Sequence, residues 1–269
     1  MKKIALSLFA LAFFISGNAQ ISKLFSKKKS EHAATTQEKE RLAAKEDSLS
    51  KSHASVINYR KTARDHFMIQ YGSDIWMGAP DSIHTKGFSR HFNLYCMFDK
   101  PFKSDPHYSV AYGAGFGSSN IFFNQQFVDI GANSTTLAFT DQSGSSHFKK
   151  FKLTEIFLEA PVEVRYFSKP INPNKSWKFA VGAKFGLLLK AYTKGKNWED
   201  DQNNSLYGAN YVSKVVDNKF FDGAKAALTA RVGYGNFSLH ADYQVTGVIK
   251  QAYGPTINVL SIGLAVSGL

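Results

Sequence analysis

Hydrophobic and polar side chains alternate along two neighbouring stretches of the chain, 152–167 and 177–190. The segment between them is rich in Pro, Asn and Ser, so the pattern predicts a β-hairpin. One face of each stretch is apolar without interruption: Ile156, Leu158, Ala160, Val162, Val164 and Tyr166 on the first, and Trp177, Phe179, Val181, Ala183, Phe185, Leu187 and Leu189 on the second. The opposite face carries most of the glycine and ionised residues.

The direction in which the bulky residues point distinguishes two kinds of barrel. A soluble barrel such as a lipocalin would turn the Trp, Phe and Leu side chains inward, and about eight strands enclose too narrow an interior to hold them. Small and charged residues inside, with bulky apolar residues outside, are the pattern of a transmembrane barrel of the outer membrane. We therefore expect lipid on the apolar face.

Six more stretches alternate in the same sense and bring the expected strand number to eight: 66–77, 88–99, 108–117, 220–234, 237–247 and 256–268. Two long connections, 118–151 and 193–219, lie among shorter ones, as in bacterial barrels with long external loops and short periplasmic turns. The sequence thus predicts an all-β fold, an eight-stranded antiparallel transmembrane β-barrel over 65–269, with both termini in the periplasm.

Three local features qualify this pattern. Trp76 falls on the inward side of its strand, where the alternation offers no reason for a large ring. Pro161 lies in the middle of a strand, and its missing N–H predicts a β-bulge there. Gly113, Gly115 and Gly117 share the inward face of one strand, which predicts tight packing inside the barrel.

The N-terminal part of the chain differs from the strands. Residues 1–19 have a basic start, a short apolar run and a small residue at the end, so they predict a secretory signal peptide. Residues 20–64 are polar, rich in Lys and Arg, and without strand alternation. We interpret them as a periplasmic extension, partly helical over 37–51 and partly disordered. Such an arm is either a solvated spacer or a segment that binds a partner.

The formal net charge of +12 changes the expected partners little. A secreted chain without a nucleic-acid-binding motif is not expected to bind nucleic acid, and the excess of basic residues suits anionic lipid headgroups. Cys96 is the single cysteine, so it forms no internal disulfide, and its parity places it toward lipid. We expect outer-membrane lipid and a possible protein partner of the cell envelope.

The ionised inward side chains are expected to pair and to plug the barrel. The predicted lumen network consists of Glu155, Glu159, Glu163, Arg165, Lys178, Lys184, Lys190, Arg231, His240 and Asp242. We expect Tyr166 to lie opposite Trp177 across the first hairpin. That register places Glu159 opposite Lys184.

Two further pairs follow from the same register, and a second turn adds a third. Glu163 is expected diagonal to Lys178, and Glu155 diagonal to Lys190. Across the tight turn at 235–236, Arg231 is expected opposite His240 and diagonal to Asp242.

Candidate chemistry is weak. Ser238, His240 and Asp242 all lie on the inward face of one strand, whereas a catalytic triad converges on one atom from separate elements. Residues 199–201 are acidic but lack the glycine and ligand spacing of a calcium loop. We expect no catalytic residues, no metal site and no cofactor. The loop aromatic residues either form a partner surface or pack the loops on themselves: Phe122, Phe123, Trp198 and Tyr207.

Three segments resemble a known family. FLEAPVEVRYF is similar to the L-E-I-P strand of the PorT-like small outer-membrane β-barrel family of Bacteroidota. KGFSRHFNLYCMFDKPF and VLSIGLAVSGL resemble its second and last strands, and NAQ resembles the end of signal sequences in those bacteria. The resemblance covers 66–269 and omits 20–64. Leu269 departs from the terminal aromatic residue that is common in outer-membrane barrels.

The resemblance implies a location more than an activity, because some family members assist a protein-secretion machine and most have no assigned role. The leading hypothesis is a non-enzymatic structural or accessory protein that binds a partner through its extracellular loops or its periplasmic arm. The alternatives are a small-solute channel and an outer-membrane lipid-modifying enzyme. A plugged lumen favours the accessory protein, and a continuous water path favours the channel. A base and a nucleophile that converge in an apolar crevice favour the enzyme.

Overall fold

The computed structural model describes residues 43–51 and 67–268. Residues 43–51 form an exposed helix, inside the segment whose composition favours one. No helix among the described residues is long and apolar enough to cross a membrane. The predicted signal peptide and the rest of the predicted extension lie outside the described residues.

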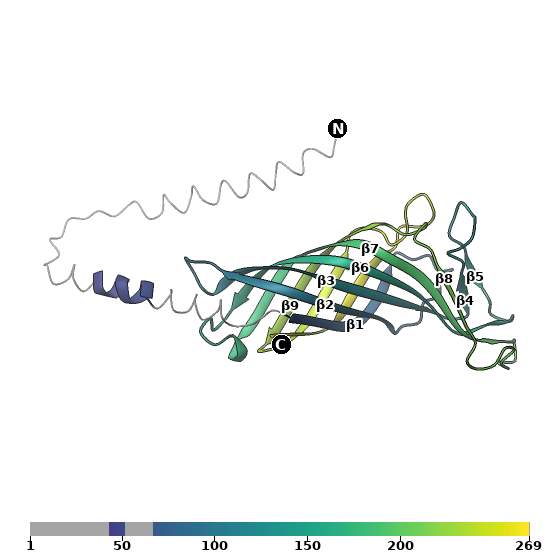
Figure 1. The fold of residues 1–269 in the computed structure, drawn as a ribbon, viewed down its shortest axis with the longest axis horizontal. Helices are drawn as coiled ribbons and strands as arrows, with labels where there is room; N and C mark the ends of the chain where they lie inside the picture. The colour runs from purple at the N-terminus through teal and green to yellow at the C-terminus, as the bar shows by residue number, and fades with distance from the viewer. Residues whose placement is uncertain (1–42, 52–66, 269) are drawn as a thin grey trace, which may run out of the picture. The chain divides into compact units, whose positions relative to one another are not determined.

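From 67 onward, an antiparallel sheet closes on itself into a barrel (Figure 1). Its eight strands are β1 (Phe67–Met77), β2 (Ser89–Pro101), β3 (Tyr108–Phe123), β6 (His147–Phe167), β7 (Trp177–Glu199), β9 (Ala224–Tyr234), β10 (Phe237–Gln244) and β11 (Asn258–Ser267). Pairing of β1 with β11 and of β6 with β7 completes the ring. The predicted fold class is confirmed.

The outward face is apolar, as the alternation predicts. Phe92, Phe185 and Leu264 are among many large hydrophobic side chains that stand exposed on the barrel wall. Aromatic rings also meet on this face, Trp177 with Tyr234 at 5.7 Å between ring centroids. An exposed apolar band with aromatic residues is typical of strands that face lipid.

The two long connections contain ordered structure that the sequence pattern did not predict. Strand β3 continues to Phe123 and β6 begins at His147. The two strands therefore extend into the connection 118–151 and pair with each other there. Strand β7 extends to Glu199 and pairs with an additional strand, β8 (Val212–Val216). A small hairpin of β4 (Gln126–Val128) and β5 (Phe139–Asp141) completes this end of the barrel, which we call the loop end.

A hydrophobic cluster fills the loop end from inside and explains the inward position of Trp76. The Trp76 ring packs edge-on against Phe123 at 5.6 Å and Phe139 at 6.3 Å. Other buried members come from most of the strands and loops: Ile83, Ile121, Val128, Ile130, Leu137, Phe151, Leu153, Phe220, Phe221, Val248, Ile249 and Ile257. Because this cluster closes the barrel like a soluble core, a large ring belongs on the inside here.

The register of the β6–β7 hairpin differs from the prediction by two residues. Tyr166 lies opposite Phe179, not Trp177. The turn sets this register: Ser168 N donates to Trp177 O at 3.0 Å, and the 3-10 helix η1 (Pro173–Lys175) lies within the connection, so Tyr166 and its partner are two residues further apart in the chain than expected. Glu159 therefore lies opposite Gly186, and the predicted direct pairing with Lys184 is wrong.

The bulge is also elsewhere than predicted. The β6–β7 register shifts between Ile156 and Phe157, which lie opposite Lys190 and Leu188, so Leu189 is the extra residue. Pro161 is accommodated differently, because the β3–β6 pairing runs to Tyr112–Val162 and resumes only at Gly115–Glu159. The missing proline N–H thus falls in an interruption of the ladder.

Candidate functional site

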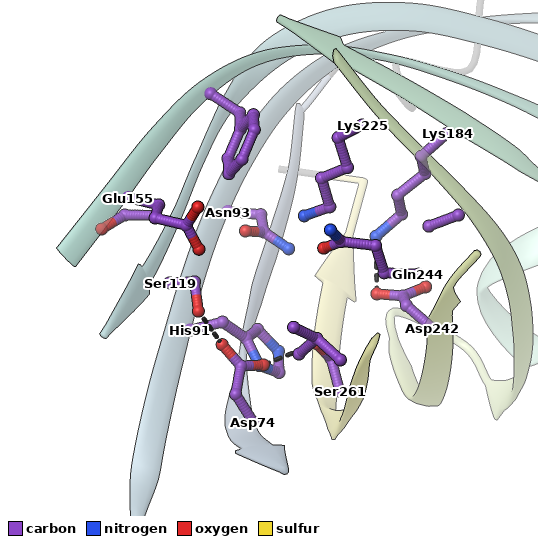
Figure 2. Close-up of a pocket in the computed structure, with 14 residues that line it drawn as sticks. Asp74, His91, Asn93, Ser119, Glu155, Lys184, Lys225, Asp242, Gln244 and Ser261 are labelled. Carbon is purple, nitrogen blue, oxygen red and sulfur yellow. Dashed lines mark hydrogen bonds and ion pairs between the residues drawn. The ribbon is translucent and has the colours of Figure 1, made fainter. Parts of the chain in front are cut away.

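Buried charged residues project into the lumen of the barrel, and Figure 2 shows Glu155, Lys184 and Asp242 among them. Glu159 and Glu163 on β6 are each only 1% exposed. They alternate with outward apolar residues, so the strand itself places each carboxylate in the lumen. Charges so far from bulk water need partners, and those of Glu159 and Glu163 come from other strands or from a neighbour on the same strand.

Glu163 is held by two arginines. Arg231 on β9 donates from Nη2 to Oε2 at 2.6 Å and from Nε to Oε1 at 3.0 Å. Arg165 donates from Nε to Glu163 Oε2 at 2.9 Å, and its Nη1 lies 3.9 Å from Asp99 Oδ1. The two-point contact with Arg231 is the strong, geometrically specific form of an arginine–carboxylate pair. It ties β6 to β9 across the intervening β7.

Glu159 is held by Lys225 and Tyr95, which reach it from two other strands. Lys225 Nζ lies 2.8 Å from Glu159 Oε1, and the Tyr95 hydroxyl donates to Glu159 Oε2. The carboxylate fits because glycines lie beside it on both neighbouring strands, Gly117 on β3 and Gly186 on β7. The predicted tight packing on the glycine face of β3 is therefore directed at this carboxylate.

Lys184 on β7 connects its strand with β1 and β10 across the lumen. Its Nζ donates to Asp242 Oδ2 at 2.7 Å and to Gln70 Oε1 at 2.8 Å. Gln70 also accepts from Asn93 Nδ2 at 3.1 Å. The ammonium lies 5.3 Å from the centroid of the Tyr95 ring, which adds a cation–π contact.

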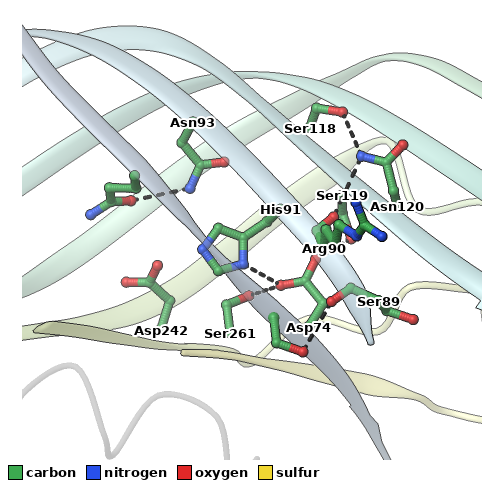
Figure 3. Close-up of polar contacts among 12 residues, drawn as sticks. Asp74, Ser89, Arg90, His91, Asn93, Ser118, Ser119, Asn120, Asp242 and Ser261 are labelled. Carbon is green, nitrogen blue, oxygen red and sulfur yellow. Dashed lines mark hydrogen bonds and ion pairs between the residues drawn. The ribbon is translucent and has the colours of Figure 1, made fainter. Parts of the chain in front are cut away.

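Asp74 anchors a chain of two imidazoles, and Figure 3 shows Asp74 with the first of them, His91. It accepts hydrogen bonds from Ser119 Oγ and Ser261 Oγ at 2.5 Å each, and its Oδ1 lies 2.8 Å from His91 Nδ1. His91 Nε2 lies 2.9 Å from His240 Nε2, so one ring donates and the other accepts. His240 is buried as well, which ties β1, β2 and β10 together at this level.

This arrangement lacks the geometry of a triad. His240 Nε2 lies 3.8 Å from Asp242 Oδ2, beyond hydrogen-bond distance. Ser238 lines a separate small cavity near Lys178 and Phe167, and the described residues show no hydrogen bond between Ser238 and His240. Nor does any group of His, Cys, Asp and Glu in the described ranges have the arrangement of a metal site.

The space left within the lumen network is small. A cavity of about 20 Å³ lies among Asp74, Glu155, Lys225 and their neighbours. That volume holds about one water molecule. At this level the side chains of the network leave little space in the lumen.

The loop end carries an aromatic hollow of about 340 Å³ lined by Phe127, Gln142, Phe148, Trp198, Tyr207, Tyr211 and Ser213. Phe148 packs edge-on against Trp198 at 4.6 Å, and Tyr207 lies 5.1 Å from Tyr211. Tyr207 is 68% exposed, whereas Phe123 is buried in the hydrophobic cluster. Of the loop aromatic residues, Phe123 thus packs within the loops, whereas Tyr207 is exposed.

A hydrogen-bonded turn orders the loop beside this hollow. Asp200 accepts from the backbone N–H groups of Asn204 at 2.7 Å and Gln202 at 2.9 Å. These bonds, the one from Asn204 first, hold the pKa of Asp200 below its usual value. Glu199 pairs with Lys149 at 3.0 Å, so the acidic residues at 199–201 serve the loop itself.

A family model described as an outer membrane protein beta-barrel domain matches residues 57–249. The chain belongs to this family. The barrel is accordingly a protein of the outer membrane, in contact with its lipid. No sequence among the curated proteins matches the chain.

Solved structures of two outer-membrane barrels are similar to this one. One is Ail, the attachment invasion locus protein of Yersinia pestis, at 13% identity, with 75% of this chain and 96% of that chain covered and a TM-score of 0.30. The other is a porin of Rh. blastica in a mutant form, at 10% identity, with 75% and 98% covered and a TM-score of 0.18.

Most predicted members of the lumen network meet inside this outer-membrane barrel, but with other partners. Arg231 lies opposite His240 and diagonal to Asp242 in the sheet, as expected, yet its side chain binds Glu163. Lys184 binds Asp242 rather than Glu159. Glu163 is bound by Arg231 and Arg165, and Glu155 does not pair with Lys190, which is exposed.

Three predicted members of the network have surroundings that differ from the prediction. Lys178 is half-buried near the short turns, 5.5 Å from the Phe167 ring centroid. Lys190 is exposed on the outside, so its expected inward position is wrong, because the extra residue Leu189 reverses the parity of β7. Glu155 is buried opposite Ala191, and it has no ion-pair partner among the described residues.

Five members of the network were not among the predicted site residues: Gln70, Asp74, His91, Tyr95 and Lys225. All five have inward parity, which was the available signal. Lys225 shares its parity with Thr229 and Arg231 on β9. Parity shows that a side chain enters the lumen, but it does not identify which of the other inward groups it meets.

Proposed function

We propose that this outer-membrane barrel is a non-enzymatic structural or accessory protein that does not conduct solutes and binds a partner at its loop end. The observation that carries the proposal is the contrast between the two parts of the molecule. Ion pairs and a hydrophobic cluster fill the lumen, whereas the loop end is ordered by β4, β5 and β8 and exposes aromatic rings. Exposed Tyr and Trp residues are frequent anchors in protein interfaces.

The placement of the connections supports an extracellular loop end. The turns β2–β3, β6–β7 and β9–β10 are short and lie at one end, together with the start of β1 and the end of β11. The β4–β5 hairpin and β8 lie at the other end. Outer-membrane barrels have short periplasmic turns and long external loops. In this proposal both termini, and the extension 20–64, lie in the periplasm.

Membership of the PorT-like family and an accessory role in protein secretion are the finer forms of this proposal. They rest on the segments that resemble that family, FLEAPVEVRYF above all. The alternatives, a small-solute channel or a lipid-modifying enzyme, have less support. A channel needs a water path through the cavity of about 20 Å³. A lipid-modifying enzyme needs a nucleophile beside His240, and Ser238 is not hydrogen-bonded to that imidazole in the described part of the chain.

Two measurements test the proposal. In planar bilayers the purified protein should give no ion conductance, because the lumen is filled. A photo-crosslinking amino acid at Tyr207 should capture an envelope protein in living cells. The same amino acid at Ile171, equally exposed at 68% but at the short-turn end, is the matched control.

Stable single-channel conductance would support the transport alternative over this proposal. Equal crosslinking from both positions, or none from Tyr207, would contradict a partner site at the loop end.

A further inference from the structure

Five lysines share one surface of the sheet that β6, β7 and β8 form at the loop end. Lys150 lies directly opposite Lys196, and Lys152 directly opposite Lys194. On the other side of β7, Lys194 lies opposite Lys214. We call these five residues the lysine face. Like charges directly opposite one another destabilise a sheet, so the fold places these residues together against its own stability.

The lysine face points away from the barrel axis, on the same side as the lipid-facing residues. On β6, Lys150 and Lys152 have the parity of the exposed Leu158, while Phe151 and Leu153 point into the loop-end cluster. On β7 the extra residue Leu189 reverses the parity and thereby turns the following even-numbered residues outward. The five lysines therefore continue the outward wall of the barrel beyond its apolar band.

These charges lack an acidic partner among the residues that the structure describes. Among the described residues, none of the five forms an ion pair with a carboxylate, although the adjacent Lys149 pairs with Glu199. Lys152 Nζ donates to Asn120 Oδ1 at 2.6 Å, and Lys214 lies 4.3 Å from the Tyr192 ring centroid. These neutral contacts orient the ammonium groups without neutralising them.

The lysines surround a space that a ligand can enter. A hollow of about 240 Å³ is lined by Phe122, Lys150, Lys152, Lys194 and Lys196. Phe122 forms its wall, with Arg90 and Lys152 at 5.6 and 5.8 Å from the ring centroid. The hollow is slightly smaller than the roughly 300–1,000 Å³ of typical small-molecule sites, which suits one phosphorylated headgroup rather than a large ligand.

We propose that the lysine face binds the phosphate groups of an anionic lipid headgroup in the outer leaflet. Several lysines around one hollow match a phosphate, which accepts hydrogen bonds from ammonium groups in any direction. A lipid is favoured over a soluble polyanion because the face continues the lipid-contacting wall and does not lie on the top of the loops. Basic clusters beside a membrane attract anionic lipids in the same way.

The test uses the full chain in phosphatidylcholine vesicles that contain either phosphorylated lipid A or its dephosphorylated form. Native mass spectrometry then counts the lipid A molecules that stay bound. Wild type should retain the phosphorylated form preferentially. A quadruple variant changes Lys150, Lys152, Lys194 and Lys196 to Gln. It should retain at least roughly tenfold fewer molecules of phosphorylated lipid A than wild type.

The control variant changes four exposed lysines at the short-turn end to Gln: Lys100, Lys103, Lys169 and Lys175. It removes the same charge and should retain the lipid as wild type does. Folding of each variant is checked by its heat-dependent gel mobility. If the quadruple variant does not fold, the pair Lys152→Gln and Lys194→Gln replaces it.

The unfolding temperature provides a second test, because the lysines should lower it without anionic lipid and raise it when that lipid is bound. In vesicles without anionic lipid, the lysine-face variant should unfold at the same or a higher temperature than wild type, because repulsion is relieved. Phosphorylated lipid A should raise the unfolding temperature of wild type only. Equal lipid retention by wild type and variant would overturn the proposal. It would also be overturned if wild type bound heparin tightly but did not bind phosphorylated lipid A.

Discussion

At the scale of single residues, the lumen network shows how a membrane barrel places charges in its interior. The carboxylates of Glu159, Glu163 and Asp242 each have a cationic partner, and these partners come from strands far apart in the sequence. Removing one partner of a buried pair leaves the other charge uncompensated, which is more unfavourable than losing both. The pairing observed in the lumen can therefore be tested by comparing single and double substitutions.

Glu159→Gln should lower the free energy of unfolding by up to about 3–5 kcal/mol, because Lys225 loses its counter-charge. Adding Lys225→Met should recover part of this loss. Adding Lys184→Met should not, because Lys184 pairs with Asp242 instead. Denaturant titration of the refolded barrel in detergent measures all three. Recovery by Lys184→Met and not by Lys225→Met would contradict the observed pairing and favour the one expected from the sequence.

At the scale of elements, the inward glycines of β3 make room for large side chains of the neighbouring strands. A Cβ added at Gly117 would lie 2.7 Å from the Glu159 carboxylate, and one at Gly115 would lie 2.0 Å from Leu94 O. Such distances are shorter than van der Waals contact. At Gly115 the clash is with backbone, whereas at Gly117 a Cβ would require the Glu159 side chain to move. The register of β3 against β2 and β6 thus depends on these residues.

Gly117→Ala should destabilise the barrel by about 1–3 kcal/mol, as expected for overpacking. The matched control is Gly87→Ala, because a Cβ at Gly87 has no atom within 4 Å in the described structure. Gly87→Ala should be neutral or slightly stabilising. Combining Gly117→Ala with Glu159→Gln should give less than the sum of the two effects, since both act on one contact. Additive losses in the same denaturant titration would show that Gly117 and Glu159 act independently.

At the scale of the whole molecule, the barrel has its own closed sheet, its own loop-end cluster and its own lumen network, all within 67–268. The predicted extension precedes this unit and shows no pattern of core residues. Independent folding of the barrel is the expectation, since truncation is tolerated where the removed backbone makes few buried contacts.

Deletion of 20–60 should therefore leave the barrel in the outer-membrane fraction with an unchanged heat-dependent gel shift. The extension would then be a spacer or a binding arm, which pull-down with the full and the shortened chain distinguishes. Loss of the gel shift in the shortened chain would instead show that the arm is part of the fold.

The sequence by itself determined the fold class, the strand number and the lipid-facing surface, because each depends on an alternation of period two that every strand carries locally. It also indicated which charged residues enter the lumen, except beyond the extra residue Leu189, where parity reverses. Tertiary structure alone decided their partners, since Glu159 meets Lys225 only after the ring has closed with a particular register. The same holds for Trp76, whose inward position makes sense only beside Phe123 and Phe139 from distant segments. Alternation specifies a face, whereas contacts across a barrel depend on turn lengths, bulges and closure, which no single strand contains.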